Sequence, residues 1–404
     1  MARPLKLSAT AIARCKRCPT LFRLAHILGI RLVDSTEAQR IGIGWHMGTQ
    51  LLTVRSGETC PVCRRKPVSF DCPLCGPGED RIVSEVDVEH RFDRLTIWLE
   101  AAYQHIPDNV SPEDWAVERN RLLAALRVWD WYWTNDEVET VATEVPFDIP
   151  LVHPEGGHPL RGRFVGVIDR LIRRNGTLQI SEFKSTSRNV DSGSTLWNRF
   201  RRSTQSTGYI LAARLLQRTG ALEQYGVKPD EPLVSGVLYD VWHKPSTSLK
   251  RLTQKDSAEF LDSKKYYDGR LTVKAGPPGS FFIEGDQTEA MPGKREGTFS
   301  IRETPTMYYF RLLSELRENA ATYFARREFP HTDQQLKAYQ WERFHLYQMI
   351  LTMKRTGHWY SSEDQCETPW HCEYLPICDN HTTIPDDVEL PSGFTRIFSD
   401  SKKG

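Results

Sequence analysis

Three residues whose types could do chemistry lie close to one Asn-Gly pair: Asp169, Glu182 and Lys184. The segments on either side of residues 175–176 are rich in β-branched side chains, and an Asn-Gly pair between such segments predicts a β-hairpin with a type I′ turn. A two-residue turn here sets Asp169 directly opposite Glu182, with Cβ atoms about 5 Å apart. Lys184 follows Glu182 by two positions and therefore points to the same face of the sheet.

Two carboxylates placed opposite each other destabilise a hairpin, and a sequence that breaks a local rule in this way often marks a functional site. A divalent cation removes the conflict, and hard oxygen ligands suit Mg²⁺ or Mn²⁺. Such an ion can activate a water molecule and stabilise the charge that builds on a phosphate, and Lys184 can orient the water or neutralise that charge. The alternative is an ordinary surface hairpin with Glu182 and Lys184 solvated, because a lone Glu-x-Lys is common. A β-bulge would shift the pairing.

The nine cysteines fall into groups along the chain. The most regular group is Cys-x-x-Cys, eight residues, and Cys-x-x-Cys again, formed by Cys60, Cys63, Cys72 and Cys75. Two such pairs suit tetrahedral Zn²⁺ and predict a small zinc ribbon with a structural role. The alternative is a DNA- or partner-binding appendage, which the basic residues 64–66 would serve.

Hydrophobic periodicity predicts the elements that must position these residues. We expect helices over residues 8–55, 92–134 and 194–220, and strands over residues 138–151, 162–174, 177–186 and 232–244. A polar stretch that contains glycine and proline predicts a long excursion over residues 254–300, and two long helices are expected within residues 305–356.

These elements predict an α/β (α+β) fold in which helices flank a central mixed sheet. The expected regions are an N-terminal helical region (1–56), a zinc-ribbon-like insertion (57–79), a second helical region (80–139), a core (140–253), an insertion or long loop (254–304), and C-terminal helices with cysteines (305–404).

The chain has 404 residues and a net charge of +1, which excludes a globally basic coat protein for nucleic acid. Contact with a polyanion would need a local basic surface, for which the candidates are Arg163, Arg170, Arg173, Arg174, Arg199, Arg201 and Arg202. No stretch is apolar for the length that crosses a bilayer, and residues 1–10 lack a signal-peptide pattern. We therefore expect a cytoplasmic protein with reduced thiols and no membrane partner.

The stretch "GVIDRLIRRNGTLQISEFKST" resembles the core of the PD-(D/E)XK nuclease superfamily in its RecB-like branch. That family has an Asp at the end of one strand and Glu-x-Lys on the next, so the resemblance implies a restriction-endonuclease-like sheet in which Asp169, Glu182 and Lys184 are catalytic. The following "QSTGY" matches the Gln-x-x-x-Tyr motif of the branch, whose two side chains share a helix face. The resemblance implies that Gln205 and Tyr209 position DNA and support the metal ligands; alone, they would be solvated and core residues.

Upstream, "GIGWHMGTQLL" resembles the helical segment that carries the metal-binding histidine of the family, here His46. The resemblance therefore implies that His46, Asp169 and Glu182 hold the Mg²⁺ or Mn²⁺ ion. Glu144 stands where the family often has a glutamate, and we give it a supporting role at most.

The segments "CKRCPTLFRL" and "HCEYLPIC" resemble the cysteine segments of iron–sulfur RecB-like nucleases. This implies a 4Fe–4S cluster held by Cys18, Cys366, Cys372 and Cys378, which would tie the two chain ends together, with Cys15 as a spare. The gap between the last two cysteines has five residues, where this subgroup commonly has two. Zinc at the same four thiols is the alternative.

The resemblance covers residues 11–50, 140–210 and 366–378, and it implies a metal-dependent DNA nuclease. We expect an exonuclease for DNA that is single-stranded or has free ends, acting in recombination, end processing or phage DNA metabolism, with a recombination protein as a candidate partner. A spacer-trimming nuclease of the CRISPR type, with integrase partners, is one alternative. A non-catalytic DNA-binding or assembly protein that keeps the fold is the other.

Overall fold

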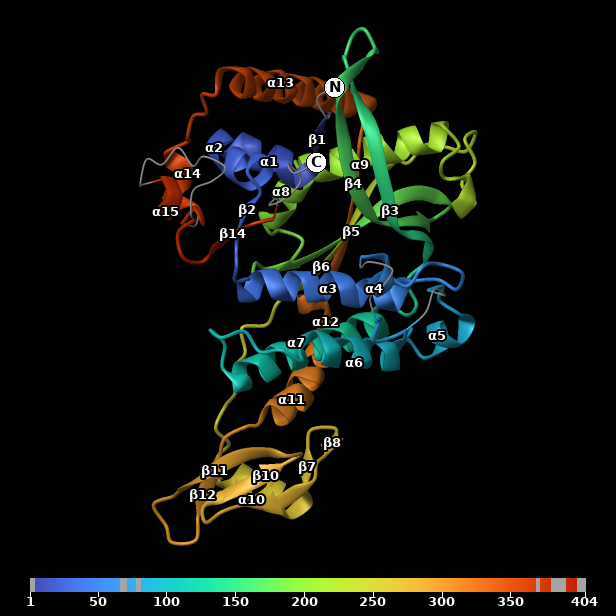
Figure 1. Cartoon of the computed structure of the whole chain (residues 1–404). Coiled ribbons are helices and arrows are strands. Elements are labelled where there is room, and N and C mark those ends of the chain that lie inside the picture. Colours follow the sequence, from blue (N-terminus) through green and yellow to red (C-terminus); the bar gives the residue numbers. More distant parts are fainter. Residues whose placement is uncertain (1–3, 66–70, 78–80, 368–370, 379–389, 398–404) are drawn as a thin grey trace.

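The computed structural model describes residues 4–65, 71–77, 81–367, 371–378 and 390–397 (Figure 1). At its centre lies a six-stranded mixed sheet with the order β1-β4-β5-β6-β13, and β3 pairs with β4 off this path. The strands are β1 (Leu5–Leu7), β3 (Val138–Val152), β4 (Pro159–Arg174), β5 (Thr177–Thr186), β6 (Gly236–His243) and β13 (Phe324–Pro330). The pairs β1–β4 and β5–β6 are parallel and the others are antiparallel. The predicted fold class, a mixed sheet flanked by helices, is confirmed.

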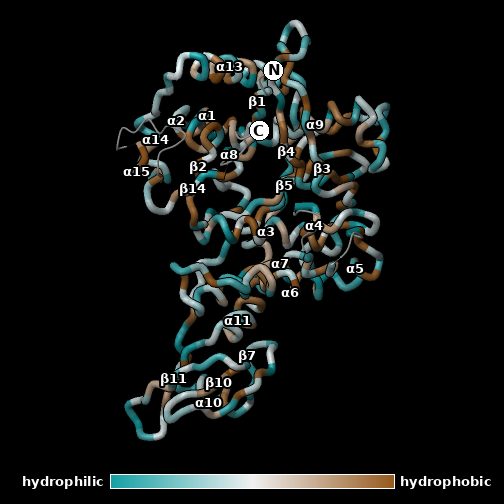
Figure 2. Tube along the Cα trace, viewed as in Figure 1, coloured by the Kyte–Doolittle hydropathy of each residue, from teal (hydrophilic) through white to brown (hydrophobic). Residues whose placement is uncertain are grey.

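Helices cover both faces of this sheet (Figure 1). On one face lies α3 (Glu37–Thr53), and α6 (Arg91–Ala102), α7 (Pro112–Tyr132) and α11 (Pro305–Glu318) pack behind it. On the other face lies α9 (Thr204–Arg218), beside α1 (Ala9–Arg17) and α13 (Asp333–Thr356). The hydrophobic residues gather along the strands and the inner sides of these helices (Figure 2). The sheet therefore has two buried faces, one for each helical layer.

The hairpin between β4 and β5 has the predicted turn and register. Asn175 and Gly176 both have positive φ angles, 50° and 72°, as a type I′ turn requires. The paired residues run from Arg174 opposite Thr177 back to Arg170 opposite Ser181. A bulge does not occur in this ladder, so the next position of β4, Asp169, comes to the level of Glu182.

The expected helix over residues 194–220 is split into α8 (Leu196–Arg201) and α9. Ser203 is the reason, because its side chain accepts a hydrogen bond from the backbone N–H of Ser206 and begins a new helix. A serine that bonds to nearby backbone in this way favours a helix N-terminus over a helix interior. The new start places Gln205 in the first turn of α9.

Residues 254–304, expected as an insertion or long loop, form a folded unit at one end of the molecule (Figure 1). Its elements are α10 (Gln254–Ser263), the pair β7 (Lys265–Tyr266) and β8 (Gly269–Arg270), and a four-stranded sheet of β9 (Val273–Ala275), β10 (Ser280–Ile283), β11 (Asp286–Pro292) and β12 (Phe299–Ile301). Phe260, Ile283 and Ile301 are buried in a small core of their own. This core is small and the unit carries many polar and charged residues, which explains why the sequence reads as a polar excursion.

The two helices expected within residues 305–356 are present as α11 and α13, but a strand lies between them. After α12 (Ala320–Tyr323), the chain enters β13 and pairs antiparallel with β6 at the edge of the central sheet. The remaining elements are α2 (Pro19–Phe22), the π-helix η1 (Arg23–Ile27), β2 (Ile30–Leu32), α4 (Pro61–Arg64), α5 (Glu85–Glu89), the 3₁₀-helix η2 (Glu223–Tyr225), α14 (Asp364–Glu367), α15 (Leu375–Cys378) and β14 (Phe394–Arg396). Strand β14 pairs with β2, which brings the two end regions of the chain together.

Candidate active site

The candidate site lies where α3 crosses strands β3, β4 and β5. Gly44 and Gly48 let α3 approach α7 closely, since a Cβ atom on Gly44 would lie 2.6 Å from Leu122. Trp45 is fully buried against Trp242 of β6, with ring centroids 4.7 Å apart. These contacts fix the rotation of α3 and bring the next residue, His46, to the sheet.

His46 joins two carboxylates from neighbouring strands. Its Nδ1 lies 3.4 Å from Oδ2 of Asp169 on β4, and its Nε2 lies 3.2 Å from Oε1 of Glu144 on β3. One ligand atom from each of these three residues lies within 4.8 Å of the others, a spacing that could hold one metal ion. The structure therefore brings together His46 and Asp169, as predicted, and makes Glu144 a full member of the group.

Glu182 lies beside this group as a fully buried carboxylate. Its Oε2 is 2.8 Å from Nζ of Lys184 and accepts a hydrogen bond of 3.2 Å from the side-chain amide of Gln205. Its Oε1 is sealed from solvent and has no hydrogen-bond partner among the described residues. A buried oxygen without a partner costs free energy, and a cation would satisfy it. His46, Glu144 and Asp169 thus offer ligand atoms close enough for one hard divalent ion, and Glu182, which is not part of that group, offers a further buried oxygen.

The pKa values of the site show how the charges depend on one another. Burial, followed by the charge of Asp169, raises the pKa of Glu182 to about 7. Burial alone would raise the pKa of Asp169 too, but the charge and hydrogen bond of His46 outweigh it and lower that pKa. Burial opposes the charge on His46 and Lys184, yet the nearby carboxylates raise both pKa values, for His46 to about 9. The protonated His46 and Lys184 thus balance the carboxylates in the way a bound cation would.

The two residues of the Gln-x-x-x-Tyr motif have different surroundings. Gln205 bridges the site, since its Oε1 accepts a hydrogen bond of 3.4 Å from Lys184 and its amide donates to Glu182. Tyr209 is buried one turn further along α9, with its ring 5.4 Å from that of Phe147, and burial raises the pKa of its hydroxyl. Gln205 therefore contacts Glu182 and Lys184 directly, and Tyr209 lies in the core one turn further along the same helix.

The sequence alone did not indicate Gln50, which follows His46 by one helical turn. Its side-chain amide donates a hydrogen bond to Oε1 of Glu144 and lies 2.7 Å from Nε2 of His46. The available signal was the four-residue spacing from His46 on one helix face. Glu144 has a φ of 51°, a left-handed conformation that is rare within a strand for any residue other than glycine.

The sequence matches the family model of the PD-(D/E)XK nuclease superfamily over residues 6–379. This chain belongs to the PD-(D/E)XK nuclease superfamily. The resemblance drawn from Asp169, Glu182 and Lys184 is thereby confirmed at the level of the superfamily, whose members are nucleases that use divalent metals. No curated protein matches the sequence. Among the described residues, no helix is both long and apolar enough to cross a membrane.

A basic cleft of about 610 Å³ opens beside the superfamily motif. Its walls come from α1, β5, α8 and α9, and they include Lys16, Lys184, Arg199, Arg202 and Gln205. The other expected basic surface, on β4, is largely neutralised. Its members are buried or paired with acids: Arg170 is 3% exposed, Arg163 pairs with Asp148, Arg173 with Glu231, and Arg174 with Asp136 and Glu328.

The four cysteines of the insertion lie close enough together to hold a single metal ion. Their sulfur atoms all lie within 4.8 Å of one another, at Cys60, Cys63, Cys72 and Cys75. Tetrahedral Zn²⁺ with bonds of about 2.3 Å needs sulfur atoms roughly 3.8 Å apart, so the group fits such an ion with small adjustments. Cys60, Cys63 and Cys72 are buried, although the insertion has little apolar mass.

The second set of cysteines lines one small cavity of about 20 Å³ between the two end regions of the chain. Cys18 comes from the junction of α1 and α2, and Cys366, Cys372 and Cys378 come from the segment around α14 and α15. In the described part of the chain, this set does not form a group as tight as that of the insertion. A cluster of several atoms needs ligands further apart than one ion does. Cys15 is instead buried in the main core, and burial raises its pKa to about 11.

Proposed function

We propose that this chain is a Mg²⁺- or Mn²⁺-dependent deoxyribonuclease that degrades DNA from its ends. The observation that carries the proposal is the buried Oε1 of Glu182, which has no hydrogen-bond partner among the described residues and lies beside the group of His46, Glu144 and Asp169. His46, Asp169 and Glu182 would hold the ion, with Glu144 fixing the imidazole of His46. When bound, the ion supplies an activated water and stabilises negative charge on the phosphate.

Lys184 and Gln205 would act on the substrate side of this site. Lys184 lines the basic cleft while its Nζ is held by Glu182 and Gln205. A lysine fixed in this way can orient the attacking water and neutralise the charge that develops on the scissile phosphate. Because the site is buried and the three acidic residues are already in place, little reorganisation is needed when the phosphate arrives.

The substrate would run through the basic cleft. Arg199 and Arg202 line it without an ion-pair partner among the described residues, and Lys16, which is paired with Glu342, lines it too, so the cleft offers positive charge to a phosphate backbone. DNA that is single-stranded or has a free end would enter this cleft, and the enzyme would act in recombination, end processing or phage DNA metabolism.

The two cysteine sets would hold structural metals. The tight group around Cys60 suits Zn²⁺, and the looser set around Cys18 suits a 4Fe–4S cluster that ties the chain ends together. Zinc at the second set is the alternative. Thiols kept for metals are expected in a reducing compartment, which supports a cytoplasmic location.

Cleavage of end-labelled linear DNA and of covalently closed circular DNA, each with Mg²⁺ or Mn²⁺, tests the proposal. We expect degradation of the linear form and survival of the circle. Cleavage of both forms would show an endonuclease. Survival of both forms with a persistent gel shift would favour the non-catalytic DNA-binding protein, and cleavage only with added integrase subunits would favour the spacer-trimming nuclease.

A further inference from the structure

We infer that Arg65, on the cysteine insertion, is a positioning residue for the metal site, and that the metal held by the four cysteines keeps it in place. The inference rests on the proposed function, because it concerns the ion that the nuclease would use. We call the segment Cys60–Cys75 the knuckle. Its residues 66–70 lie outside the residues that the structure describes.

Arg65 reaches from the knuckle to the metal group. Its Nη2 donates a hydrogen bond of 3.0 Å to the side-chain oxygen of Gln50 and lies 3.1 Å from Oε2 of Glu144. The other oxygen of Glu144 contacts His46. Arg65 therefore holds Glu144 from one side while Glu144 holds the imidazole from the other, and the side chain of Glu144 is only 8% exposed. Without Arg65, a buried carboxylate would lose its strongest partner outside the group.

Arg64 and Glu58 hold the backbone of the same strand. Nη1 of Arg64 donates to the carbonyl oxygens of Thr143 and Glu144 at 2.8 and 3.4 Å. Glu58 accepts hydrogen bonds from the backbone N–H and the hydroxyl of Thr143 at 3.1 and 3.0 Å. These contacts surround the one residue of β3 with a positive φ. A strained conformation persists where its surroundings determine it, and here they include Arg64 of the knuckle and Glu58, which precedes the knuckle.

The described residues of the knuckle gather four cysteines within reach of one metal ion. Helix α4 has four residues, and the four thiols are too close together to carry negative charge without a cation among them. A metal at the cysteines would fix α4, α4 would fix Arg64 and Arg65, and these would fix Glu144. Arg65 and Glu144 would thereby connect the knuckle metal to the catalytic ion.

The test measures equilibrium binding of Mn²⁺ to the full chain by electron paramagnetic resonance, together with the kcat and KM of DNA cleavage. Arg65→Met is expected to weaken Mn²⁺ binding by about 10-fold or more and to lower kcat, with the KM for DNA unchanged. Arg65→Lys should restore part of the binding. Arg91→Met is the matched control, because Arg91 has a similarly half-buried ion pair with Asp130 away from the site.

Wild-type Mn²⁺ affinity in Arg65→Met would overturn the inference, as would an equal loss in Arg91→Met. Absence of saturable Mn²⁺ binding by the wild type would overturn both the inference and the proposed function. Mn²⁺ binding that depends on Arg65, in a protein that cleaves no DNA, would contradict the proposed function but not the inference. Removal of knuckle zinc by a chelator, followed by the same titration, should reproduce the Arg65→Met result.

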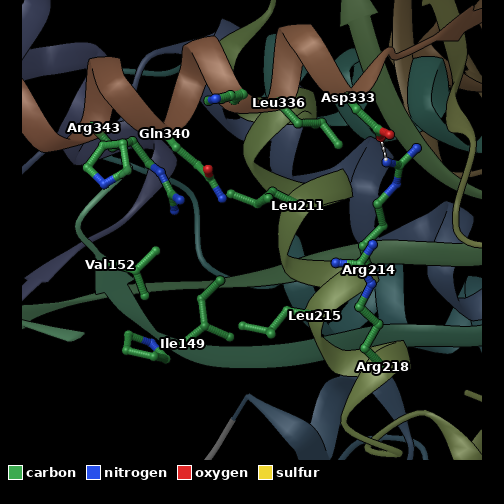
Figure 3. Close-up of a pocket in the computed structure, with 13 residues that line it drawn as sticks. Ile149, Val152, Leu211, Arg214, Leu215, Arg218, Asp333, Leu336, Gln340 and Arg343 are labelled. Carbon is green, nitrogen blue, oxygen red and sulfur yellow. Dashed lines mark hydrogen bonds and ion pairs between the residues drawn. The ribbon is translucent and has the colours of Figure 1, made fainter. Parts of the chain in front are cut away.

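A different observation carries a second proposal: we propose that a pocket of about 390 Å³ between β3, α9 and α13 binds an organic anion with an apolar body. Figure 3 shows its walls, with Ile149 and Val152 from β3, Leu211 and Leu215 from α9, and Leu336 from α13. The volume is that of a small-molecule site, and the mixture of apolar walls with a few polar groups is typical of one.

The charged residues of this pocket are mostly cations. Arg214, Arg218, Lys337 and Arg343 line it, and its one acid, Asp333, is paired with Arg214. Arg343 is 3% exposed, and its Nε and Nη1 have no hydrogen-bond partner among the described residues. The rings of Phe164 and Tyr339 lie 5.0 and 5.1 Å from its guanidinium carbon. A buried cation with no ion-pair partner among the described residues lacks a counter-charge, which an anionic ligand would supply.

Two fluorescent probes with the same apolar body test the charge. Anilinonaphthalene sulfonate is an anion, and N-phenylnaphthylamine lacks the sulfonate. We expect the full chain to bind the anion at least tenfold more tightly, and Arg343→Met to abolish that preference while it keeps binding the neutral probe. Equal preference in Arg343→Met and wild type would overturn the proposal. Displacement by a nucleoside monophosphate would assign a phosphate head group and displacement by octanoate a carboxylate, while displacement by neither would contradict the proposal.

Discussion

The ammonium group of Lys184 lies 2.8 Å from Oε2 of Glu182, two positions earlier on the same strand. This ion pair engages one oxygen of a fully buried carboxylate, and the other, Oε1, has no hydrogen-bond partner in the part of the chain that the structure describes. The pair thus serves two purposes in the proposed nuclease. It keeps Lys184 at the floor of the basic cleft, and it keeps a carboxylate oxygen available for a cation.

Replacing Lys184 by methionine is expected to lower the rate of DNA cleavage by about 10²–10³-fold, because a fixed positive charge beside the scissile phosphate is lost. Steady-state cleavage of labelled linear DNA measures the effect. Lys16→Met is the control from the same cleft, since Lys16 pairs with Glu342 rather than with the acidic site. Lys16→Met should reduce the affinity for DNA by a larger factor than it reduces kcat. A Lys184→Met protein that cleaves at the wild-type rate would contradict this role.

Replacing Gln205 by alanine removes contacts to both Glu182 and Lys184. Because Gln205 orients a ligand and does not itself supply one, we expect a loss of about 10–100-fold in activity. Tyr209→Phe keeps the buried ring and should cost less, whereas Tyr209→Ala should destabilise the fold by about 3–5 kcal/mol. Cleavage rates and thermal unfolding together separate the two roles. Equal activity in Gln205→Ala and wild type would refute the bridging role.

Acid should destabilise the region around His26. Burial, followed by the charges of Arg14 and Arg31, lowers the pKa of His26 to about 4, and its Nε2 has no partner among the described residues. Between pH 6.5 and about 4, this histidine is protonated in the unfolded chain but neutral in the folded chain. The stability that neutral His26 contributes is therefore present above pH 6.5 and is lost as the pH falls through 4.

Thermal unfolding of wild type and His26→Phe across this pH range measures the effect. Phenylalanine can keep the stacking on Phe22, whose ring centroid lies 5.5 Å from the imidazole. The melting temperature should fall less steeply with decreasing pH in His26→Phe than in wild type. The control His358→Phe, at an exposed histidine, should leave the dependence of melting temperature on pH unchanged. Identical slopes in all three proteins would rule out His26 as the cause.

Two single substitutions separate the metal sites of the cysteines. In anaerobically purified protein, Cys372→Ser should lose iron and the visible absorbance but keep zinc, and Cys72→Ser should lose zinc but keep iron. Cys372→Ser should also lower the melting temperature, because the Cys18 set lies where the two end regions of the chain meet. Metal analysis checks the assignment, and zinc alone in the wild type would replace the iron–sulfur proposal by two zinc sites.

The sequence predicted the hairpin of the site because its determinants are local. An Asn-Gly turn requires two positive φ angles, and those angles fix the register that brings Asp169 to the level of Glu182. Gln205 was predicted from the motif, although the split at Ser203 that sets its position was not. The positions of residues that depend on their neighbours in the sequence could thus be predicted from the sequence alone.

The rest depends on contacts between distant segments. Strand β13 has the sequence FARREFP and resembles a polar connection, but pairing with β6 makes it a strand, and Arg326 is satisfied there by Asp240 and Asp136. Glu144 enters the site through a backbone conformation that no residue type predicts, and Arg65 reaches it from 79 positions away. Such relationships arise only once the chain has folded.

The most direct test of the proposed nuclease site is the rate at which Asp169→Asn cleaves end-labelled linear DNA in Mn²⁺, compared with wild type. Asp148→Asn serves as the control, because Asp148 is an exposed acid on the neighbouring strand that pairs with Lys6 and Arg163. Mutating a residue that hydrogen-bonds to a metal ligand typically lowers activity by about 10–100-fold. Mutating a ligand itself should therefore lower the cleavage rate by at least about 10²-fold. The account predicts that Asp169→Asn loses cleavage but still binds DNA, while Asp148→Asn cleaves normally. Cleavage by Asp169→Asn at the wild-type rate would contradict it.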